Sequence, residues 1–197
     1  QSNSIRIIAG QWRGRRLQVL DREGLRPTTD RVRETVFNWL MSDISGARCL
    51  DLFAGTGALG LESLSRGAAF VQFCEMDRAA AGLLTKNVGI LMGSATSSST
   101  STSTSTSGAA SESDRANVVC SEALRYLKQV DAKPFDIIFL DPPFEGLEIL
   151  REALLLIHQR GLIAPEGLVY IENNRFDDPF SASEDEKNLS ISADDSL

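Results

Sequence analysis

The sequence predicts an α/β fold with a mainly parallel sheet and helices on both faces of that sheet. After Gly46, short apolar runs alternate with segments of helical periodicity, which is the order of elements in such folds. The runs are almost continuously apolar, as expected for strands that are covered on both sides. With 197 residues and 42% hydrophobic content, the chain can bury one core of ordinary size. We therefore expect one main domain with appendages.

The segment before Gly46 predicts a small β-hairpin followed by a helix. The stretch IRIIAGQWRGRRLQVL alternates around a glycine-containing centre, which is typical of a hairpin. The residues RPTTD then supply a turn and a helix N-cap, and Val32, Val36, Trp39 and Leu40 recur at helical spacing. We assign residues 1–45 to this N-terminal extension and interpret residues 1–3 as the remnant of a tag.

Five apolar runs in the rest of the chain are predicted strands, and four segments between them are predicted helices. The runs are RCLDLF (48–53), FVQFCE (70–75), NVVC (117–120), FDIIFLD (135–141) and GLVYIE (167–172). The helical segments are GALGLESLSRG, residues 78–91, EALRYLKQV and LEILREALLLIHQRG. This places the main domain at residues 46–176. In parallel sheets of this kind ligands bind beyond the carboxyl ends of the strands, so the residues there are the candidates for a site.

Two stretches have compositions that are not typical of a packed fold. Residues 94–108 read SATSSSTSTSTSTSG, and we interpret residues 94–114 as a flexible insertion between a helix and a strand. Residues 177–197 are rich in serine and acidic residues, and we expect them to form an acidic C-terminal segment.

The charge is spread unevenly along the chain. The formal net charge is −7, but residues 1–34 contain eight arginines and four acidic residues, a net charge of +4. Residues 172–197 contain eight acidic and two basic residues, a net charge of −6. A basic arm on an acidic protein is a candidate phosphate-binding surface, and a solvated charged face is the alternative.

The composition also narrows the class of protein. Cys49, Cys74 and Cys120 lie within predicted strands, where buried, reduced thiols fit better than disulfides or a metal site. No apolar run approaches the roughly 20 residues needed to cross a bilayer. We expect a monomer without a metal or a membrane partner, located in the cytoplasm or in an organelle such as a plastid or mitochondrion.

The loop DLFAGTGALG (51–60) carries the first chemical motif. Its Gly55-x-Gly57-x-x-Gly60, with Glu75 at the end of the next strand, matches the dinucleotide fingerprint, in which a helix N-terminus accepts a pyrophosphate. Asp51 favours a different ligand, because its carboxylate would repel a pyrophosphate but attract an ammonium and a sulfonium group. S-adenosyl-L-methionine carries both groups. A glycine turn without a ligand is the remaining interpretation.

The second motif is Asp141-Pro142-Pro143-Phe144, directly after the apolar run FDIIFL. Two prolines cannot continue a helix or a central strand, because each lacks an N–H and has a fixed φ. They therefore hold the backbone in one direction just where a ligand is expected. A strand-ending turn with a capping aspartate is the structural alternative.

Together these motifs resemble those of the amino-methyltransferases that modify exocyclic nitrogens of bases. The stretches RIIAGQWRGRRL and RPTTDRVRETVFNWL are similar to the bacterial-type 16S ribosomal RNA guanine-N2 methyltransferases, the RsmD-like family. The resemblance runs from about Arg6 to Glu172, interrupted by the Ser/Thr tract. It implies a Rossmann-like class I methyltransferase fold. It also implies methyl transfer from S-adenosyl-L-methionine to the N2 amine of a guanine in small-subunit (16S-type) ribosomal RNA.

The resemblance further implies which residues bind the cofactor. Asp51, Gly55 and Gly57 would line its methionine part, and Glu75 would take the ribose hydroxyls. Glu122 or Ala123 would lie beside the adenine, with Met76 against its face. For Glu122 the alternative is a favourable acid at the start of a helix. The rest of the predicted cofactor loop is Phe53, Ala54 and Thr56.

The DPPF motif would then hold the amine. The carboxylate of Asp141 and the carbonyl of Pro142 would accept hydrogen bonds from the amine and stabilise positive charge that develops on nitrogen. Pro143 would help to fix that carbonyl, and Phe144 would stack on the target base. A paired base cannot reach such a pocket, so the partner is expected to be ribosomal RNA with an unpaired or flipped guanine, or a small-subunit assembly intermediate.

The basic arm would bind the RNA backbone and stack on a base. The predicted residues are Arg6, Trp12, Arg13, Arg15 and Arg16 in the hairpin, and Arg31 and Arg33 in the following helix. For the last two, pairing with Asp30 and Glu34 on the helix surface is the alternative.

Three other functions remain open at this point. An N6-adenine or other nucleic-acid amino-methyltransferase explains the glycine loop and DPPF but not the basic arm. A noncatalytic RNA-binding module with a degenerate cofactor site would bind RNA without methylating it. A dinucleotide-dependent oxidoreductase explains the glycines alone.

Overall fold

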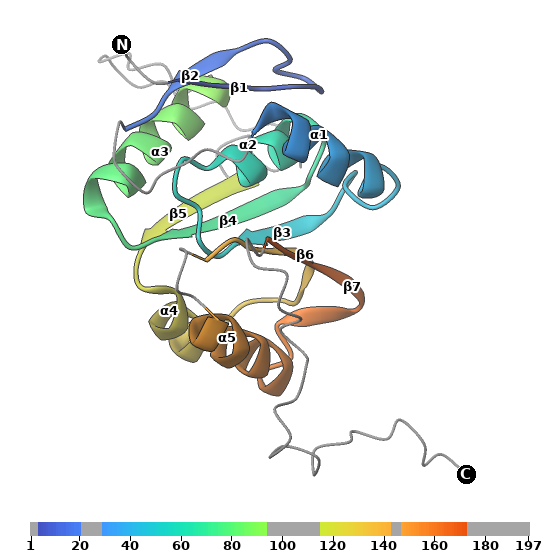
Figure 1. The fold of residues 1–197 in the computed structure, drawn as a ribbon, viewed down its shortest axis with the longest axis vertical. Helices are drawn as coiled ribbons and strands as arrows, with labels where there is room; N and C mark the ends of the chain where they lie inside the picture. Colours follow the sequence, from blue (N-terminus) through green and yellow to red (C-terminus); the bar gives the residue numbers. More distant parts are fainter. Residues whose placement is uncertain (1–3, 21–28, 94–114, 143–146, 173–197) are drawn as a thin grey trace, which may run out of the picture.

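The structure, a computed structural model, describes residues 4–20, 29–93, 115–142 and 147–172. Its centre is a five-stranded parallel sheet in the order β5-β4-β3-β6-β7 (Figure 1). The strands are β3 (Arg48–Asp51), β4 (Phe70–Glu75), β5 (Ala116–Cys120), β6 (Phe135–Leu140) and β7 (Ile163–Ile171). The predicted fold class is confirmed.

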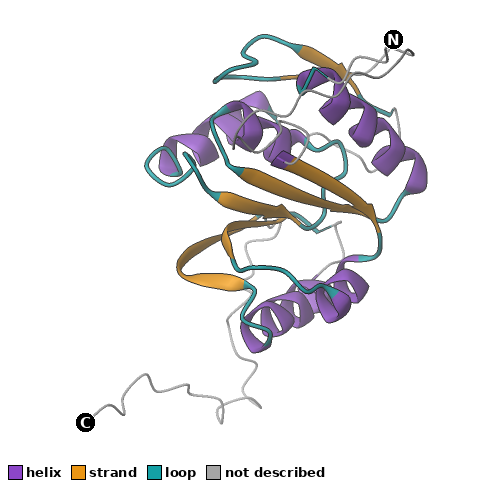
Figure 2. Cartoon of the chain, turned by 180° about the vertical axis from the view of Figure 1, so that it is seen from behind, coloured by secondary structure: helices purple, strands orange, loops and turns teal. Residues whose placement is uncertain are grey.

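Helices cover both faces of the sheet. The helices α1 (Asp30–Trp39), α2 (Ala58–Ser65) and α3 (Arg78–Leu91) lie on one face, and α4 (Ala123–Gln129) and α5 (Leu147–Gln159) lie on the other. Figure 2 shows the same three layers from behind. The helix α2 is buried along its whole length, so it is surrounded by other elements and carries no solvent-exposed face.

The two cores follow the alternation of side chains along each strand. On β6, Ile137 and Phe139 face the core beneath α1, α2 and α3, whereas Ile138 and Leu140 face the core beneath α4 and α5. Because both sets are buried, the central strands are apolar without interruption, which is the pattern from which they were predicted.

An N-terminal hairpin packs against the first of these helical layers. The strands β1 (Ser4–Arg6) and β2 (Arg16–Gln18) pair antiparallel, as predicted. Ile7 and Leu17 of this hairpin are buried in the same core as the sheet and α2. The hairpin is therefore joined to the main domain by a continuous apolar core.

Two details of the predicted elements differ from the structure. On α1 Val36 is buried as predicted, and so is Leu40 at the C-cap, but Trp39 is 70% exposed. Arg33 and Phe37 are buried instead, because the inward face of the helix is rotated relative to the one that the apolar spacing indicated. Cys120 is exposed, since it ends the edge strand β5. The other two thiols, of Cys49 and Cys74, are buried, and desolvation raises the pKa of each to about 12.

Three predicted segments lie outside the described residues: 1–3, the Ser/Thr insertion at 94–114, and the acidic segment at 177–197. Within the described part, every helix is too short or too polar to cross a membrane. The described residues also contain no cluster of three or more His, Cys, Asp or Glu side chains arranged to hold a metal ion.

Candidate active site

The sheet order places a topological switch point between β3 and β6. From β3 the chain moves outward through β4 to β5, and it then returns to the other side of β3 to form β6 and β7. The connections on the two sides of this point leave in opposite directions, and in open α/β sheets ligands bind at such a point, beyond the carboxyl ends of the strands. Asp51 ends β3 and Asp141 follows β6, so two of the predicted site residues flank the switch point.

The glycine loop turns the chain sharply from β3 into α2. Gly55 and Gly57 both have positive φ, 52° and 75°, and Gly57 is the N-cap of α2. A Cβ on Gly57 would lie 2.3 Å from a methyl carbon of Leu84 on α3. The loop therefore needs glycine both for its backbone conformation and for close packing against the neighbouring helix.

Asp51 lies beneath this loop with its carboxylate turned toward α2. The side chain is 3% exposed, and Oδ2 accepts a hydrogen bond of 3.0 Å from the backbone N–H of Gly60. Burial raises the pKa of Asp51 to about 7; the Gly60 hydrogen bond opposes this shift, and the charges of Asp141 and Glu75 add to it. A cation placed here would favour the ionised form of this carboxyl group.

Glu75 holds the ends of β4 and the glycine loop together. Its Oε2 accepts a hydrogen bond of 2.7 Å from the N–H of Gly55, and its Oε1 accepts one of 2.7 Å from the N–H of Asp77. Asp77 in turn caps α3. The carboxylate is thus fixed at the mouth of the loop, and it remains partly exposed, as a ligand for hydroxyl groups must be.

The other predicted cofactor residues line the ends of β3, β4 and β5. Met76 is 72% exposed beyond β4, and Glu122 is exposed at the N-cap of α4, where its side chain makes no capping hydrogen bond. The remaining predicted members are Phe53 and Thr56, which are partly exposed, and Ala54 and Ala123, which are buried.

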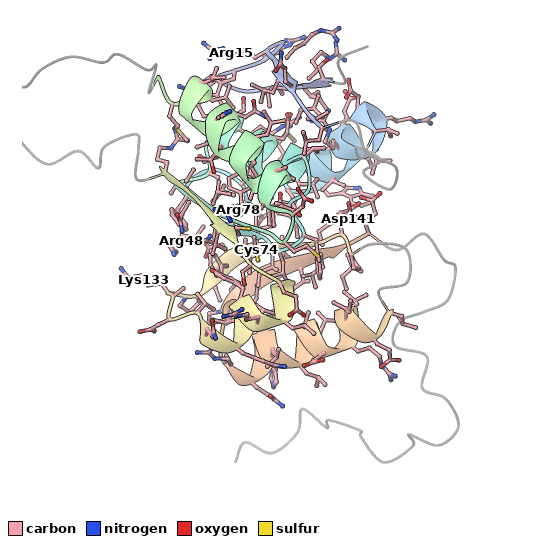
Figure 3. The ribbon with its side chains drawn as sticks, turned by 90° about the vertical axis from the view of Figure 1, so that its left-hand side faces the viewer. Arg15, Arg48, Cys74, Arg78, Lys133 and Asp141 are labelled. Carbon is pink, nitrogen blue, oxygen red and sulfur yellow. The ribbon has the colours of Figure 1, made fainter. Side chains whose placement is uncertain are left out.

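The DPPF motif is described only in its first half. Asp141 and Pro142 are partly exposed after β6, and Figure 3 shows Asp141 at the opposite end of the sheet from Arg48 and Lys133. Pro143 and Phe144 lie outside the described residues. The charge of Asp141 acts on both Asp51 and Tyr170, which shows that the three side chains share one region.

Two residues near Asp141 were missed in the sequence. The N–H of Glu172 bonds to the carbonyl of Leu140 at 2.9 Å, which brings the end of β7 beside Asp141. Burial, Glu172 and Asp141 all raise the pKa of Tyr170, whose side chain is hydrogen-bonded to Glu172. The signal was present, because Glu172 follows the apolar run LVYI, and Asp51, Glu75 and Asp141 likewise stand at the ends of apolar runs.

The hairpin presents part of the predicted RNA surface. Arg13, Arg15 and Arg16 are exposed in it, and Arg31 is exposed on α1. Figure 3 shows Arg15 on the side of the hairpin that is remote from the sheet. Arg6 is 52% exposed but is paired with Asp30 at 2.9 Å.

The structure does not agree with direct RNA contacts by Trp12 and Arg33. Trp12 is 5% exposed because its ring is part of the core between the hairpin and α2. Arg33 is 1% exposed, and its guanidinium lies between Asp30 and Glu62, at 2.6 and 3.7 Å. The alternative of pairing with Asp30 is confirmed for Arg33, and both residues hold the arm in place from inside the protein.

A pocket connects the hairpin to the glycine loop. It is lined by Gln18 and Leu20 at the end of the hairpin, by Gly55 and Thr56 of the loop, and by residues of α3 that include Leu84. The predicted cofactor loop and the basic arm are therefore neighbours in space.

Comparison with known proteins identifies the family. The family described as "Conserved hypothetical protein 95" matches residues 5–189. Ribosomal RNA small subunit methyltransferase D of Escherichia coli is 47% identical over 172 residues, which is 87% of this chain and 76% of the relative. The protein of the same name from Haemophilus influenzae is 44% identical over 87% of this chain and 79% of its own length.

The chain belongs to this family of ribosomal RNA methyltransferases. A solved Escherichia coli structure described as "Putative methyltransferase yhhF" is similar with a TM-score of 0.68 and 43% identity, over 86% of this chain and 80% of that one. A SAM-dependent methyltransferase from Agrobacterium tumefaciens, 18% identical, has a TM-score of 0.56 over 79% of this chain and 49% of its own, which supports the fold alone. The predicted Rossmann-like methyltransferase fold and family are thus confirmed.

Proposed function

We propose that this protein transfers a methyl group from S-adenosyl-L-methionine to the exocyclic N2 amine of a guanine in small-subunit ribosomal RNA. The observation that carries the proposal is the arrangement at the switch point, where the glycine loop and Asp51 adjoin Asp141 across paired strands. The family membership supports the reaction class and the RNA substrate.

The side chains at the ends of β3 and β4 fit the proposed cofactor. S-adenosyl-L-methionine, when bound, supplies a methyl group on a positively charged sulfur. Asp51 and Glu75 place two carboxyl groups next to backbone turned by glycines, and a bound cation favours the charged form of Asp51. That charge suits an ammonium and a sulfonium, and it would oppose a pyrophosphate. Glu75 can accept hydrogen bonds from ribose hydroxyls while it keeps its own bonds to the loop, because carboxylate oxygens have several acceptor positions.

Asp141 and Pro142 are proposed to act on the target amine. The lone pair of an exocyclic amine is delocalised into the base, so the nitrogen is a weak nucleophile until its protons are held out of the ring plane. An aspartate oxygen and a backbone carbonyl can accept those protons as hydrogen bonds and stabilise the positive charge that develops on nitrogen. The rigid backbone at Pro142 fixes the direction of its carbonyl before the base arrives.

The exposed arginines of the hairpin are proposed to bind RNA phosphates. Arg13, Arg15 and Arg16 are exposed without acidic side chains among their immediate chain neighbours. Such a cluster attracts the backbone of RNA without reading its sequence. The reaction is then expected wherever small subunits of the bacterial type are assembled, in the cytoplasm or in an organelle.

Methyl transfer to RNA, followed by nucleoside analysis, tests this function. The purified protein is given labelled S-adenosyl-L-methionine and small-subunit RNA, free or in partly assembled particles, from cells that lack the modification. We expect N2-methylguanosine as the labelled nucleoside. N6-methyladenosine would establish the other amino-methyltransferase instead. RNA binding without any labelled nucleoside would favour a noncatalytic module.

A further inference from the structure

The carboxylate of Glu62 is fully buried in the middle of α2 and is bonded to the hairpin. Its Oε2 accepts a hydrogen bond of 2.8 Å from the N–H of Ile8, and its Oε1 accepts one of 3.0 Å from the N–H of Ala9. Arg66 donates to Oε1 at 2.8 Å, and Arg33 lies 3.7 Å from Oε2. A buried carboxylate is costly unless such partners compensate it, and here both oxygens are compensated.

This arrangement fixes the orientation of the hairpin as well as its position. Each oxygen of one carboxylate holds one of two consecutive amides, so rotation of the Ile8–Ala9 backbone would break at least one hydrogen bond. Arg33 adds a third connection, because it donates to the carbonyl of Arg6 at 2.9 Å. The arm is thus held by directional bonds in addition to apolar packing.

Ser65, one turn further along α2, makes a second attachment. Its hydroxyl donates to the carbonyl of Ala9 at 2.6 Å and accepts from the N–H of Trp12 at 3.0 Å. Its carbonyl accepts from the N–H of Gln11 at 2.7 Å. The turn of the hairpin approaches so closely that a Cβ on Gly10 would lie 1.9 Å from the Ser65 carbonyl oxygen.

The other end of α2 belongs to the candidate cofactor site. Gly57 caps the helix, and the N–H of Gly60 binds Asp51. The second strand of the hairpin is attached in the same manner to α3, where Asn87 is 3% exposed and donates to the carbonyl of Gln18 at 2.9 Å. Figure 1 shows the hairpin lying across these two helices, which follow the two strands that end in Asp51 and Glu75.

We propose that Glu62 and Ser65 are positioning residues, which set the RNA-binding hairpin at a fixed distance and angle from the methyl donor. The inference rests on the proposed function and adds to it a connection between the two binding surfaces. Neither side chain touches RNA or cofactor in this account. Each acts through the hairpin backbone, so its loss loosens the arm and leaves the cofactor loop in place.

The test compares two buried serines of α2. Ser65→Ala removes both hydroxyl bonds to the hairpin, whereas Ser63→Ala removes a hydroxyl that bonds to Leu59 within the same helix. For each variant, KM and kcat with ribosomal RNA, the Kd for S-adenosyl-L-methionine and the amide hydrogen exchange of residues 5–17 are measured. Glu62→Gln is examined in the same way where circular dichroism shows that it folds.

We expect Ser65→Ala to raise the KM for RNA by roughly tenfold, since two buried hydrogen bonds are lost. Its Kd for the cofactor should stay within about twofold of that of the wild type, and its hairpin amides should exchange faster than those of Ser63→Ala. Equal RNA KM values and equal exchange in the two variants would overturn the proposal. So would a parallel loss of cofactor binding, which indicates general destabilisation.

The design separates this inference from the proposed function. If the wild type methylates no RNA, the proposed function fails. The hydrogen exchange of the same variants still tests whether Ser65 attaches the hairpin to α2. Faster exchange of residues 5–17 in Ser65→Ala alone then supports the attachment of the hairpin to α2 through Ser65, and unchanged exchange overturns it.

Discussion

Among single residues, Asp51 shows most directly how burial prepares the site for a cation. The carboxyl group has one backbone donor, Gly60, and two acidic neighbours, Asp141 and Glu75, so burial leaves its charged form poorly compensated. The folded protein therefore keeps a proton on Asp51 up to about pH 7, whereas the unfolded chain loses it near the ordinary value of 3.8. The stability that this group contributes is complete below that ordinary value and is lost as the pH rises toward about 7.

The same pKa predicts proton release when the cofactor binds. A cationic ligand favours the ionised carboxyl group, so we expect S-adenosyl-L-methionine to bind more weakly at about pH 5.5 than at about pH 7.5, by up to tenfold per pH unit. Calorimetry in two buffers with different heats of ionisation measures the released proton directly. Asp51→Asn should abolish the release. Proton uptake, or release that persists in Asp51→Asn, would show that another group titrates.

At the scale of elements, the hairpin and α2 depend on a close approach at one glycine. Gly10 and Gly14 both belong to the hairpin and have nearly equal positive φ values, 83° and 81°. Only Gly10 faces a neighbour, because a Cβ there would meet the backbone of Ser65, whereas nothing lies within 4 Å of a Cβ on Gly14. Substitutions at the two positions therefore distinguish the cost of backbone strain, which both share, from the cost of steric conflict, which arises only at Gly10.

Gly14→Ala should lower the free energy of unfolding by about 1–2 kcal/mol, the cost of a left-handed conformation for a residue with a Cβ. Gly10→Ala should cost more, since the hairpin must also move away from α2. Urea denaturation of both variants measures the difference. A loss for Gly10→Ala no larger than that for Gly14→Ala would contradict the close approach.

At the scale of the whole molecule, the charge of the arm opposes that of the rest of the protein. The chain has a formal net charge of −7, while its first 34 residues carry +4. Long-range repulsion between an acidic protein and RNA is then offset by one basic surface, which orients the encounter. We expect RNA binding to depend steeply on salt.

The triple variant Arg13→Ala, Arg15→Ala and Arg16→Ala tests this expectation. If each arginine neutralises a phosphate, the slope of log K against log salt should become shallower by about 2–3, with unchanged cofactor binding. The double variant Arg125→Ala and Lys133→Ala serves as the control and should leave the slope unchanged. Arg125 is exposed on α4, and Lys133 is exposed in the loop that follows this helix. Equal effects of the two sets would indicate nonspecific attraction.

The fold was predictable from the sequence because the patterns that specify its helices, strands and turns lie within short stretches of the chain. The buried strands, the glycine turn and the acids that end β3 and β4 can each be recognised within a few neighbouring residues. The burial of Arg33 and Glu62 could not be recognised in this way. Charged residues are usually exposed, and the partners of Glu62 in the hairpin lie 53 and 54 positions away. Contacts between residues so far apart in the sequence determine which charged side chains are buried.

The proposed site for the amine depends on Asp141 at the carboxyl end of β6, and the same strand provides a residue for a matched control. Asp136, at the other end of β6, accepts a hydrogen bond from the N–H of Arg48 at 2.8 Å and lies far from the glycine loop along the strand. Asp141→Asn and Asp136→Asn make the same chemical change at opposite ends of one element.

The most direct measurement is the single-turnover rate of methyl transfer to ribosomal RNA by the wild type and these two variants, with the Kd for S-adenosyl-L-methionine measured on the same preparations. We expect Asp141→Asn to lower the rate by roughly a hundredfold or more, as loss of a group that stabilises developing charge does, with a Kd within a few fold of the wild-type value. Asp136→Asn should retain the wild-type rate. A rate for Asp141→Asn equal to that of Asp136→Asn would contradict the assignment of the amine site to the end of β6.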